Sequence, residues 1–332
     1  MARRLFPDDS KTITLEDGTK YSYVYKPAGS KQPTFLLLHG FPSSSYDWRI
    51  QIPQLSGAGY GVLAPDLLGY GDTDKPTSKE GYAFKRQSTH LAKILDQEGL
   101  SKVIAVGHDW GAGFLARFAN YQPQYVSGLV FLSVPYNPPG HYDLDAINTM
   151  IEKSFGYPAF GYQYFFNDET AAGIIEKNHE SFSSIVYAED YHIWSTELCK
   201  VGALKAWVEA GKTAKFPSWL SKEEYDTHNQ ILLDGGYTGP LNWYKAAIAN
   251  VDEPSYASIP AENLIIDVPT LVVCGTKDLA TRVEVAEQVV AAGKEAGYLK
   301  DVEIKRLDCG HWIQFEKVDE CFEILDEFAK KF

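Results

Sequence analysis

The sequence predicts an α/β protein in which a mostly parallel central sheet is flanked by helices. Short, continuous apolar runs recur along the chain, and such runs are typical of parallel strands buried on both faces. Stretches with the apolar spacing of an amphipathic helix, for example around residues 84–95, separate several of these runs. The 332 residues can bury a full core, as one large domain or as a domain with an insertion.

The first expected element is a β-hairpin, because apolar and polar residues alternate on both sides of Asp17-Gly18, a dipeptide that favours hairpin turns. Buried strands are expected next at residues 35–38, 62–64, 103–106, 129–134 and 271–274. The end of the chain adds a helix at residues 283–296, a strand at 302–307 and a helical apolar stripe formed by Val318, Phe322, Leu325 and Phe328.

The pattern changes in the middle of the chain. No strong buried-strand run occurs there, and aromatic residues are dense, above all in residues 155–166. This composition indicates a mostly helical insertion that covers one edge of the sheet. We therefore expect a core domain formed by residues 1–137 and 246–332, and a helical cap formed by residues 138–245.

Composition and charge exclude several classes of partner. The net charge of −13 argues against binding to nucleic acids or anionic membranes. No apolar run approaches the length of a membrane span, and the N-terminal segment lacks the apolar core of a secretory signal. The four cysteines show no metal-binding spacing, so we expect reduced thiols in a cytoplasmic enzyme with neither metal ion nor cofactor.

The most informative motif is Gly107-His108-Asp109-Trp110-Gly111, between a predicted buried strand and a helical pattern. A sharp strand-to-helix turn needs glycines at its crowded flanking positions, and it presents the central residue as a nucleophile. We expect Asp109 to be ionised at the helix N-terminus and to attack an electrophilic carbon directly, forming an alkyl ester. The other interpretation of this short motif is an aspartate that only caps a helix.

Two further residues follow predicted strands near the end of the chain, Asp278 and His311. Because the carboxyl ends of parallel strands meet at one edge of a sheet, both can lie near Asp109. His311 would then activate the water that breaks the ester, and Asp278 would orient His311. The rival acids are Asp267, which precedes its strand, and Asp308, which is close in sequence to His311.

The loop His39-Gly40-Phe41-Pro42 leaves another predicted strand. It can direct the backbone N–H of Phe41 toward the oxyanion that forms during ester hydrolysis, and the N–H of Trp110 would be the second donor. Phe41, Trp110 and Trp312 are also expected to line the substrate site, which suggests an apolar substrate.

Three motifs together resemble the soluble epoxide hydrolases of the α/β-hydrolase superfamily. They are His39-Gly-Phe-Pro-Ser-Ser-Ser-Tyr-Asp-Trp-Arg49, Asp66-Leu-Leu-Gly-Tyr-Gly71 and Gly107-His-Asp-Trp-Gly111. The resemblance covers essentially the whole chain and implies the α/β-hydrolase fold with a helical cap. The order of Asp109, Asp278 and His311 is that of the nucleophile, acid and base in this fold. Haloalkane dehalogenases share the core motifs.

The resemblance also implies a source for the proton that an opening epoxide requires. Members of the family hold the epoxide oxygen with two cap tyrosines, and Tyr162 and Tyr244 match the two family motifs. Tyr164 is the alternative to Tyr162, because it lies two residues away. The implied partners are a small-molecule epoxide and water, and the implied product is a vicinal diol.

Three alternatives to an epoxide hydrolase remain. Haloalkane dehalogenases usually carry Asn where this chain has Phe41, and fluoroacetate dehalogenases place arginines just after the nucleophile, whereas the nearest arginine here is Arg117. A non-catalytic receptor on the same scaffold would be expected to have a broken triad. A serine esterase would need a serine in place of Asp109.

Overall fold

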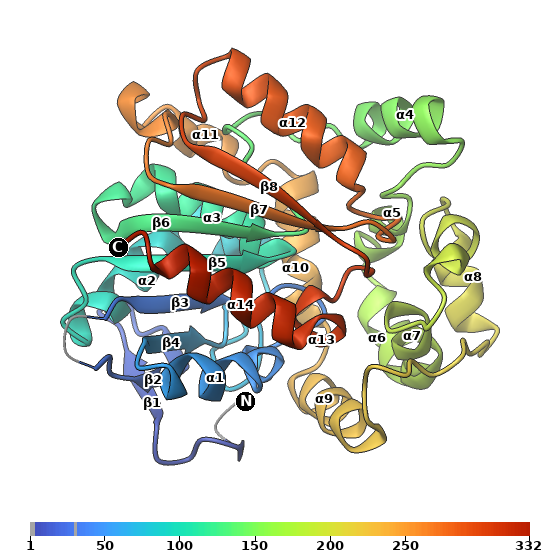
Figure 1. The fold of residues 1–332 in the computed structure, drawn as a ribbon. Helices are drawn as coiled ribbons and strands as arrows, with labels where there is room; N and C mark the ends of the chain where they lie inside the picture. Colours follow the sequence, from blue (N-terminus) through green and yellow to red (C-terminus); the bar gives the residue numbers. More distant parts are fainter. Residues whose placement is uncertain (1–3, 30–31) are drawn as a thin grey trace.

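The computed structural model describes residues 4–29 and 32–332, and it confirms the predicted α/β fold. An eight-stranded sheet runs through the centre of the molecule in the order β1-β2-β4-β3-β5-β6-β7-β8 (Figure 1). β2 pairs with β1 and β4 in antiparallel fashion, and the pairs from β4 to β8 are parallel. The strands are β1 (Ser10–Thr14), β2 (Lys20–Lys26), β3 (Thr34–Leu38), β4 (Gly61–Pro65), β5 (Val103–His108), β6 (Val126–Leu132), β7 (Thr270–Gly275) and β8 (Val302–Leu307).

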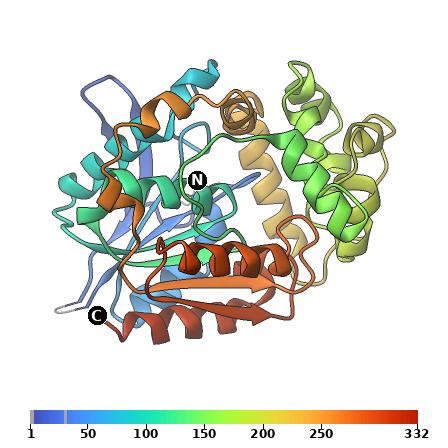
Figure 2. The same ribbon diagram turned by 90° about the horizontal axis from the view of Figure 1, so that it is seen from above.

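Helices cover both faces of this sheet, so successive side chains of the central strands enter two separate apolar layers. In β3, Leu37 packs in the layer beneath α1 and α14, whereas Leu36 packs in the layer beneath α2, α3 and α12. Figure 2 shows α14 and α12 on opposite sides of the sheet. The bounds are α1 (Gln51–Gly57), α2 (Phe84–Gln97), α3 (Trp110–Tyr121), α12 (Val283–Glu295), α13 (Ile313–Glu316) and α14 (Val318–Ala329).

Between β6 and β7 the described chain is helical and contains no strand. Figure 1 shows α4 to α9 beside the sheet, on the side toward which the arrows of β5, β7 and β8 point. The α-helices are α4 (Leu144–Phe155), α5 (Tyr162–Phe166), α6 (Ala171–Lys177), α7 (His179–Val186), α8 (Ala203–Glu209), α9 (Lys222–Gly235), α10 (Thr238–Ile248) and α11 (Glu253–Tyr256). Shorter helical turns are η2 (Ser45–Trp48), η3 (Lys79–Tyr82), η4 (Pro123–Tyr125), η5 (Tyr191–Ile193), η6 (Trp194–Leu198) and η7 (Ala261–Leu264).

The predicted elements correspond closely to the observed ones. The hairpin, the five internal strands, the strand Val302–Leu307 and the two C-terminal helices are all present. The largest difference is β6, which begins at Val126 and ends at Leu132, whereas the apolar run predicted residues 129–134. Val126 pairs with Val103 of β5, so the strand starts before the apolar run, and Ser127 lies at the register shift between this pair and the next.

Two expectations drawn from the composition, on the cysteines and on membrane spans, can be compared with the fold. All four cysteines are buried and unpaired with one another. Within the described residues, the helices are too short or too polar to span a membrane.

The two-layer packing predicts unequal effects for a matched pair of leucine truncations. Leu37 is fully buried in β3, whereas Leu233 on α9 is 40% exposed. Leu37→Ala should lower the free energy of unfolding by about 2–5 kcal/mol, because it leaves a cavity in a close-packed layer. Leu233→Ala should change it by about 0.5 kcal/mol or less. Chemical denaturation followed by tryptophan fluorescence measures both, and equal losses would contradict this packing.

Candidate active site

Three predicted residues meet at the carboxyl edge of the sheet. Asp109 follows β5, Asp278 lies in the loop after β7, and His311 lies in the loop after β8. His311 Nδ1 lies 2.7 Å from Asp278 Oδ2, and His311 Nε2 lies 3.7 Å from Asp109 Oδ2. The geometry therefore places the predicted base, His311, between the predicted nucleophile, Asp109, and the predicted acid, Asp278.

The turn that carries Asp109 has an unusual backbone conformation and very close contacts at its two glycines. Asp109 has φ 53° and ψ −121°, a conformation that side-chain-bearing residues rarely adopt. A Cβ atom at Gly107 would lie 2.5 Å from the Gly111 carbonyl oxygen, and one at Gly111 would lie 2.3 Å from the Leu38 carbonyl oxygen. Both glycines are therefore required by close backbone contacts. In the described chain the Asp109 side chain makes no capping hydrogen bond to α3, so a simple helix cap does not account for it.

The rival acids lie away from His311. Asp308 is exposed and pairs with Lys277 Nζ at 2.9 Å, and Asp267 is exposed as well. Asp278 is instead buried, and its Oδ1 accepts the backbone N–H groups of Ala280 and Thr281, both at 2.9 Å. These bonds hold the carboxylate while its second oxygen faces the imidazole.

The electrostatics of the three residues are strongly coupled. Burial alone would raise the pKa of Asp278, but His311 and the hydrogen bonds from Thr281 lower it below its usual value. Burial alone would lower the pKa of His311, but Asp278 and then Asp109 raise it above its usual value. The two shifts agree on an Asp278 carboxylate that stabilises a cationic His311.

The pKa of Asp109 differs from the expectation based on the helix N-terminus. Burial raises this pKa, and it outweighs the opposing effects of His311 and of the backbone N–H groups of Phe41 and Trp110. A carboxylate with a raised pKa is a stronger nucleophile once ionised, because its charge is less well solvated.

One oxygen of Asp109 already lies in the predicted oxyanion site. The N–H of Phe41 donates to Asp109 Oδ1 at 2.8 Å, and the N–H of Trp110 also stabilises the carboxylate. The other oxygen, Oδ2, is the one nearest His311. The two oxygens therefore face different groups, as an attacking oxygen and a future oxyanion would.

The loop carrying His311 is held by residues that the sequence did not single out. Glu316 is a partly buried carboxylate that accepts the N–H of Gly310 at 2.8 Å, the N–H of Trp312 at 3.1 Å and the hydroxyl of Tyr191 at 2.8 Å. His108 Nε2 lies 2.9 Å from the carbonyl oxygen of His311. Burial lowers the pKa of His108 to about 3, so its imidazole is neutral and donates this bond.

The two predicted tyrosines lie across the cavity from the triad. Tyr162 and Tyr244 both line a cavity with Asp109 and His311, and their ring centroids are 6.1 Å apart. Burial, together with the charge of Asp109, raises the pKa of both phenols well above the usual range. Tyr164 is 37% exposed and bonds to Asp145, so the outward side of α5 carries the alternative tyrosine.

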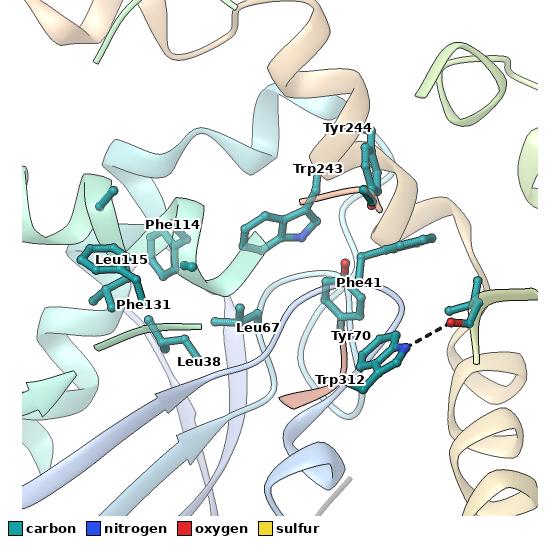
Figure 3. Close-up of a cluster of buried hydrophobic side chains, with 14 of the residues drawn as sticks. Leu38, Phe41, Leu67, Tyr70, Phe114, Leu115, Phe131, Trp243, Tyr244 and Trp312 are labelled. Atoms are coloured by element: carbon teal, nitrogen blue, oxygen red, sulfur yellow. Dashed lines mark hydrogen bonds between the residues drawn. The ribbon is translucent and has the colours of Figure 1, made fainter. Parts of the chain in front are cut away.

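The space next to Asp109 has two unequal parts. A cavity of about 50 Å³ is lined by Phe41, Phe166 and Trp312, and one of about 450 Å³ is lined by Trp110, Ile147 and Met150. The three predicted substrate residues thus all line it. Figure 3 shows Tyr244 and Trp243 extending from one helix, Tyr244 toward Phe41 and Trp243 toward Phe114, with Trp312 below. The dashed bond in Figure 3 runs from Trp312 Nε1 to the Val186 carbonyl at 3.1 Å.

Comparison with known proteins shows which proteins the chain is similar to. A family model described as the alpha/beta hydrolase fold matches residues 33–182. The chain is 33% identical to Epoxide hydrolase 3 of Siraitia grosvenorii over 90% of this chain and 92% of that protein. It is 32% identical to the mouse Bifunctional epoxide hydrolase 2 over 94% of this chain, but it spans only 54% of the mouse protein.

A solved structure also resembles this chain. The epoxide hydrolase from an endophytic Streptomyces superposes with a TM-score of 0.80 at 27% identity, covering 97% of this chain and 95% of that one. The sequence relatives, the superposition and the arrangement around Asp109 agree, and the chain belongs to the epoxide hydrolase family of the α/β-hydrolase fold.

Proposed function

We propose that the protein hydrolyses an apolar epoxide to a vicinal diol through a covalent ester on Asp109, without a metal ion or cofactor. The observation that carries this proposal is the position of Tyr162 and Tyr244, which line the same cavity as Asp109 and His311. A carboxylate nucleophile and a pair of neutral hydroxyl donors are what the opening of an epoxide requires. We propose residues 138–245 as the cap that supplies both tyrosines, and residues 1–137 and 246–332 as the core.

In the first step, Asp109 Oδ2 attacks one ring carbon, and the carbon–oxygen bond of the epoxide breaks. The bonding electrons move to the epoxide oxygen, where the hydroxyls of Tyr162 and Tyr244 stabilise the developing charge and supply a proton. Their raised pKa keeps both phenols protonated until that charge appears.

In the second step, His311 accepts a proton from water, and the resulting hydroxide attacks the carbonyl carbon of the ester. The N–H groups of Phe41 and Trp110 stabilise the oxyanion on Oδ1, which already accepts the Phe41 bond. The bond between the carbonyl carbon and Oδ2 then breaks, and His311 returns its proton to Oδ2, which leaves as part of the diol. The new carboxylic acid at Asp109 gives its proton back to the tyrosine, so the enzyme returns to its starting state. Ester formation also lowers the pKa of His311, which favours its neutral, basic form. The charge of Asp109 contributes to the raised pKa of His311, and the ester removes that charge.

The buried, reduced cysteines are consistent with a reducing compartment, and we propose a cytoplasmic location on that basis.

A side-by-side assay of one aryl epoxide and one haloalkane tests the proposal. The protein should convert the epoxide and release no halide, and Asp109→Asn should abolish conversion. One turnover in oxygen-18 water should give unlabelled diol, because water attacks the carbonyl carbon and the diol retains an oxygen of Asp109. Labelled diol in that turnover would rule out the ester mechanism, and halide release without diol would favour a dehalogenase.

The titration of His311 predicts that the rate of ester hydrolysis depends on pH. His311 must be neutral to accept a proton, so hydrolysis of the ester should slow as pH falls through the pKa of His311. The ester should accumulate at that low pH, and His311→Gln should make it accumulate at every pH. Intact-protein mass spectrometry after rapid quenching detects it as an increase equal to the substrate mass. Accumulation that rises with pH would contradict His311 as the base.

Substitution of the three tyrosines tests the proton donors. Tyr162→Phe and Tyr244→Phe should each slow ester formation by about 10²–10³-fold, the range measured for loss of one donor at a developing oxyanion. Tyr164→Phe is the matched control from the same helix turn, and it should leave the rate within about twofold, because Tyr164 faces solvent. Rapid-quench measurement of ester formation separates the three. A severe effect of Tyr164→Phe alone would exchange the roles of Tyr162 and Tyr164.

A further inference from the structure

A chain of buried polar contacts joins two helices of the proposed cap to the loop after β3. Pro42 of this loop directly follows Phe41, whose N–H binds Asp109 Oδ1. The hydroxyl of Tyr187, at the end of α7, donates to the Pro42 carbonyl oxygen at 2.9 Å. His228 of α9 lies on the other side of that hydroxyl, with its Nε2 2.8 Å from the oxygen atom. The mechanism proposed above uses neither of these two cap side chains.

Asp47 closes this chain of contacts into a ring. It lies in η2 and is 1% exposed. Its Oδ1 lies 3.2 Å from His228 Nε2, and its Oδ2 accepts the hydroxyl of Ser43. Because Ser43 directly follows Pro42, the contacts leave the loop at one residue and return to it at the next. We call this set the polar ring, and its members are Pro42, Ser43, Asp47, Tyr187 and His228.

The direction of the hydrogen bonds around Tyr187 follows from the groups involved. A carbonyl oxygen can only accept, so the single proton of the Tyr187 hydroxyl goes to Pro42. The Tyr187 oxygen therefore accepts the proton of His228 Nε2. Burial lowers the pKa of His228 to about 3, so its imidazole is neutral and carries one proton. His228 thus orients the Tyr187 hydroxyl toward the loop.

Asp47 favours the tautomer of His228 that this arrangement needs. Its Oδ1 is a second acceptor for the Nε2 proton, whereas a proton on Nδ1 would leave Nε2 without a donor toward either oxygen. Burial raises the pKa of Asp47 to about 7, and Oδ1 can accept in both charge states. Arg49, the next charged residue along the chain, binds Glu224 of α9 at 2.9 Å, so its charge is compensated separately.

The aromatic ring of Tyr187 packs without help from its hydroxyl. It lies 4.6 Å from the ring of Trp312 at an angle of 31°, and Trp312 in turn donates to the Val186 carbonyl. Tyr237 is a close match elsewhere in the proposed cap. It is equally buried, and its hydroxyl lies 2.9 Å from the Nε2 of another buried histidine, His179. In the described chain, the Tyr237 hydroxyl bonds to His179 and not to the loop after β3.

The negative charge on Asp109 Oδ1 changes in opposite directions in the two proposed steps. Ester formation removes charge from the carboxylate, so the Phe41 N–H does little to stabilise that transition state. Water attack on the ester returns charge to Oδ1, and there the N–H stabilises the developing oxyanion. A loop that holds Phe41 in place therefore matters mainly to ester hydrolysis.

We propose that the polar ring positions the Phe41 N–H for hydrolysis of the ester, by holding the Pro42 carbonyl against the cap. Its positioning side chains are Asp47, Tyr187 and His228, which act through the loop rather than on the reacting atoms. The second step then depends on how α7 and α9 sit on the core. The inference rests on the proposed function, because it assumes the ester intermediate.

Rapid-quench measurement of both steps in Tyr187→Phe tests the proposal. Ester hydrolysis should slow by about 10–100-fold, because the donor to the oxyanion is displaced, and ester formation should stay within about threefold. Tyr237→Phe is the matched control, which loses an equally buried hydroxyl and should leave both rates within about threefold. Unchanged ester hydrolysis in Tyr187→Phe, or the same slowing in both variants, would overturn the proposal.

Two variants of His228 separate the hydrogen bond from packing. His228→Gln keeps an N–H donor near the position of Nε2, so it should hydrolyse the ester within about threefold of the wild-type rate. His228→Leu lacks the donor and should be as slow as Tyr187→Phe. Because both substitutions interrupt one path, the double variant should be no slower than either single variant. Additive losses would contradict positioning through a shared path.

If Tyr187→Phe does not fold, the ratio of the ester hydrolysis rates of His228→Gln and His228→Leu replaces it, and a ratio near one would overturn the proposal. A wild-type protein that forms the ester, with hydrolysis insensitive to these substitutions, refutes the positioning role alone. Failure of the wild type to form an ester refutes the proposed function.

Discussion

The close packing of the loop after β3 against the turn after β5 is the constraint on which the active site depends. Parallel pairing of β3 with β5 sets Leu38 opposite Gly107, so the two strands end together. A Cβ atom at Gly40 would lie 2.5 Å from the Cβ of Asp109, which shows how closely the backbones approach. This approach delivers the Phe41 N–H to Asp109 and holds the carboxylate in a conformation that an isolated turn would not keep.

Backbone donors also explain how the partly buried Asp109 and the buried Asp278 and His311 can lie together. Asp278 receives two backbone N–H bonds and the imidazole of His311, so its charge is compensated without solvent. Glu316 holds the backbone on both sides of His311, which fixes the ring between the two carboxylates. The proposed chemistry thus rests on backbone donors supplied by strand-end loops, which cannot rotate away as side chains can.

The sequence was informative where local patterns decide the structure. Apolar runs and helical spacing predicted the strands and the flanking helices, and the strand-exit positions of Asp109, Asp278 and His311 predicted that they would meet. It was uninformative where contacts join distant segments. Glu316 looks like any helical glutamate, and its role depends on Tyr191 from another part of the chain. Which of Tyr162 and Tyr164 faces the cavity depends on the rotation of the short helix α5, and its packing sets that rotation.

The unequal volumes on the two sides of Asp109 have a consequence for stereochemistry. The small space beside Phe41 and Trp312 holds about 50 Å³, and the space toward α4 holds about 450 Å³. An epoxide with one bulky and one compact substituent can fill both spaces in only one of its two orientations. That orientation presents one ring carbon, from one face, to the carboxylate. Under the proposed function, we therefore expect the shape of the cavity to select both the ring carbon that Asp109 attacks and the hand of the diol.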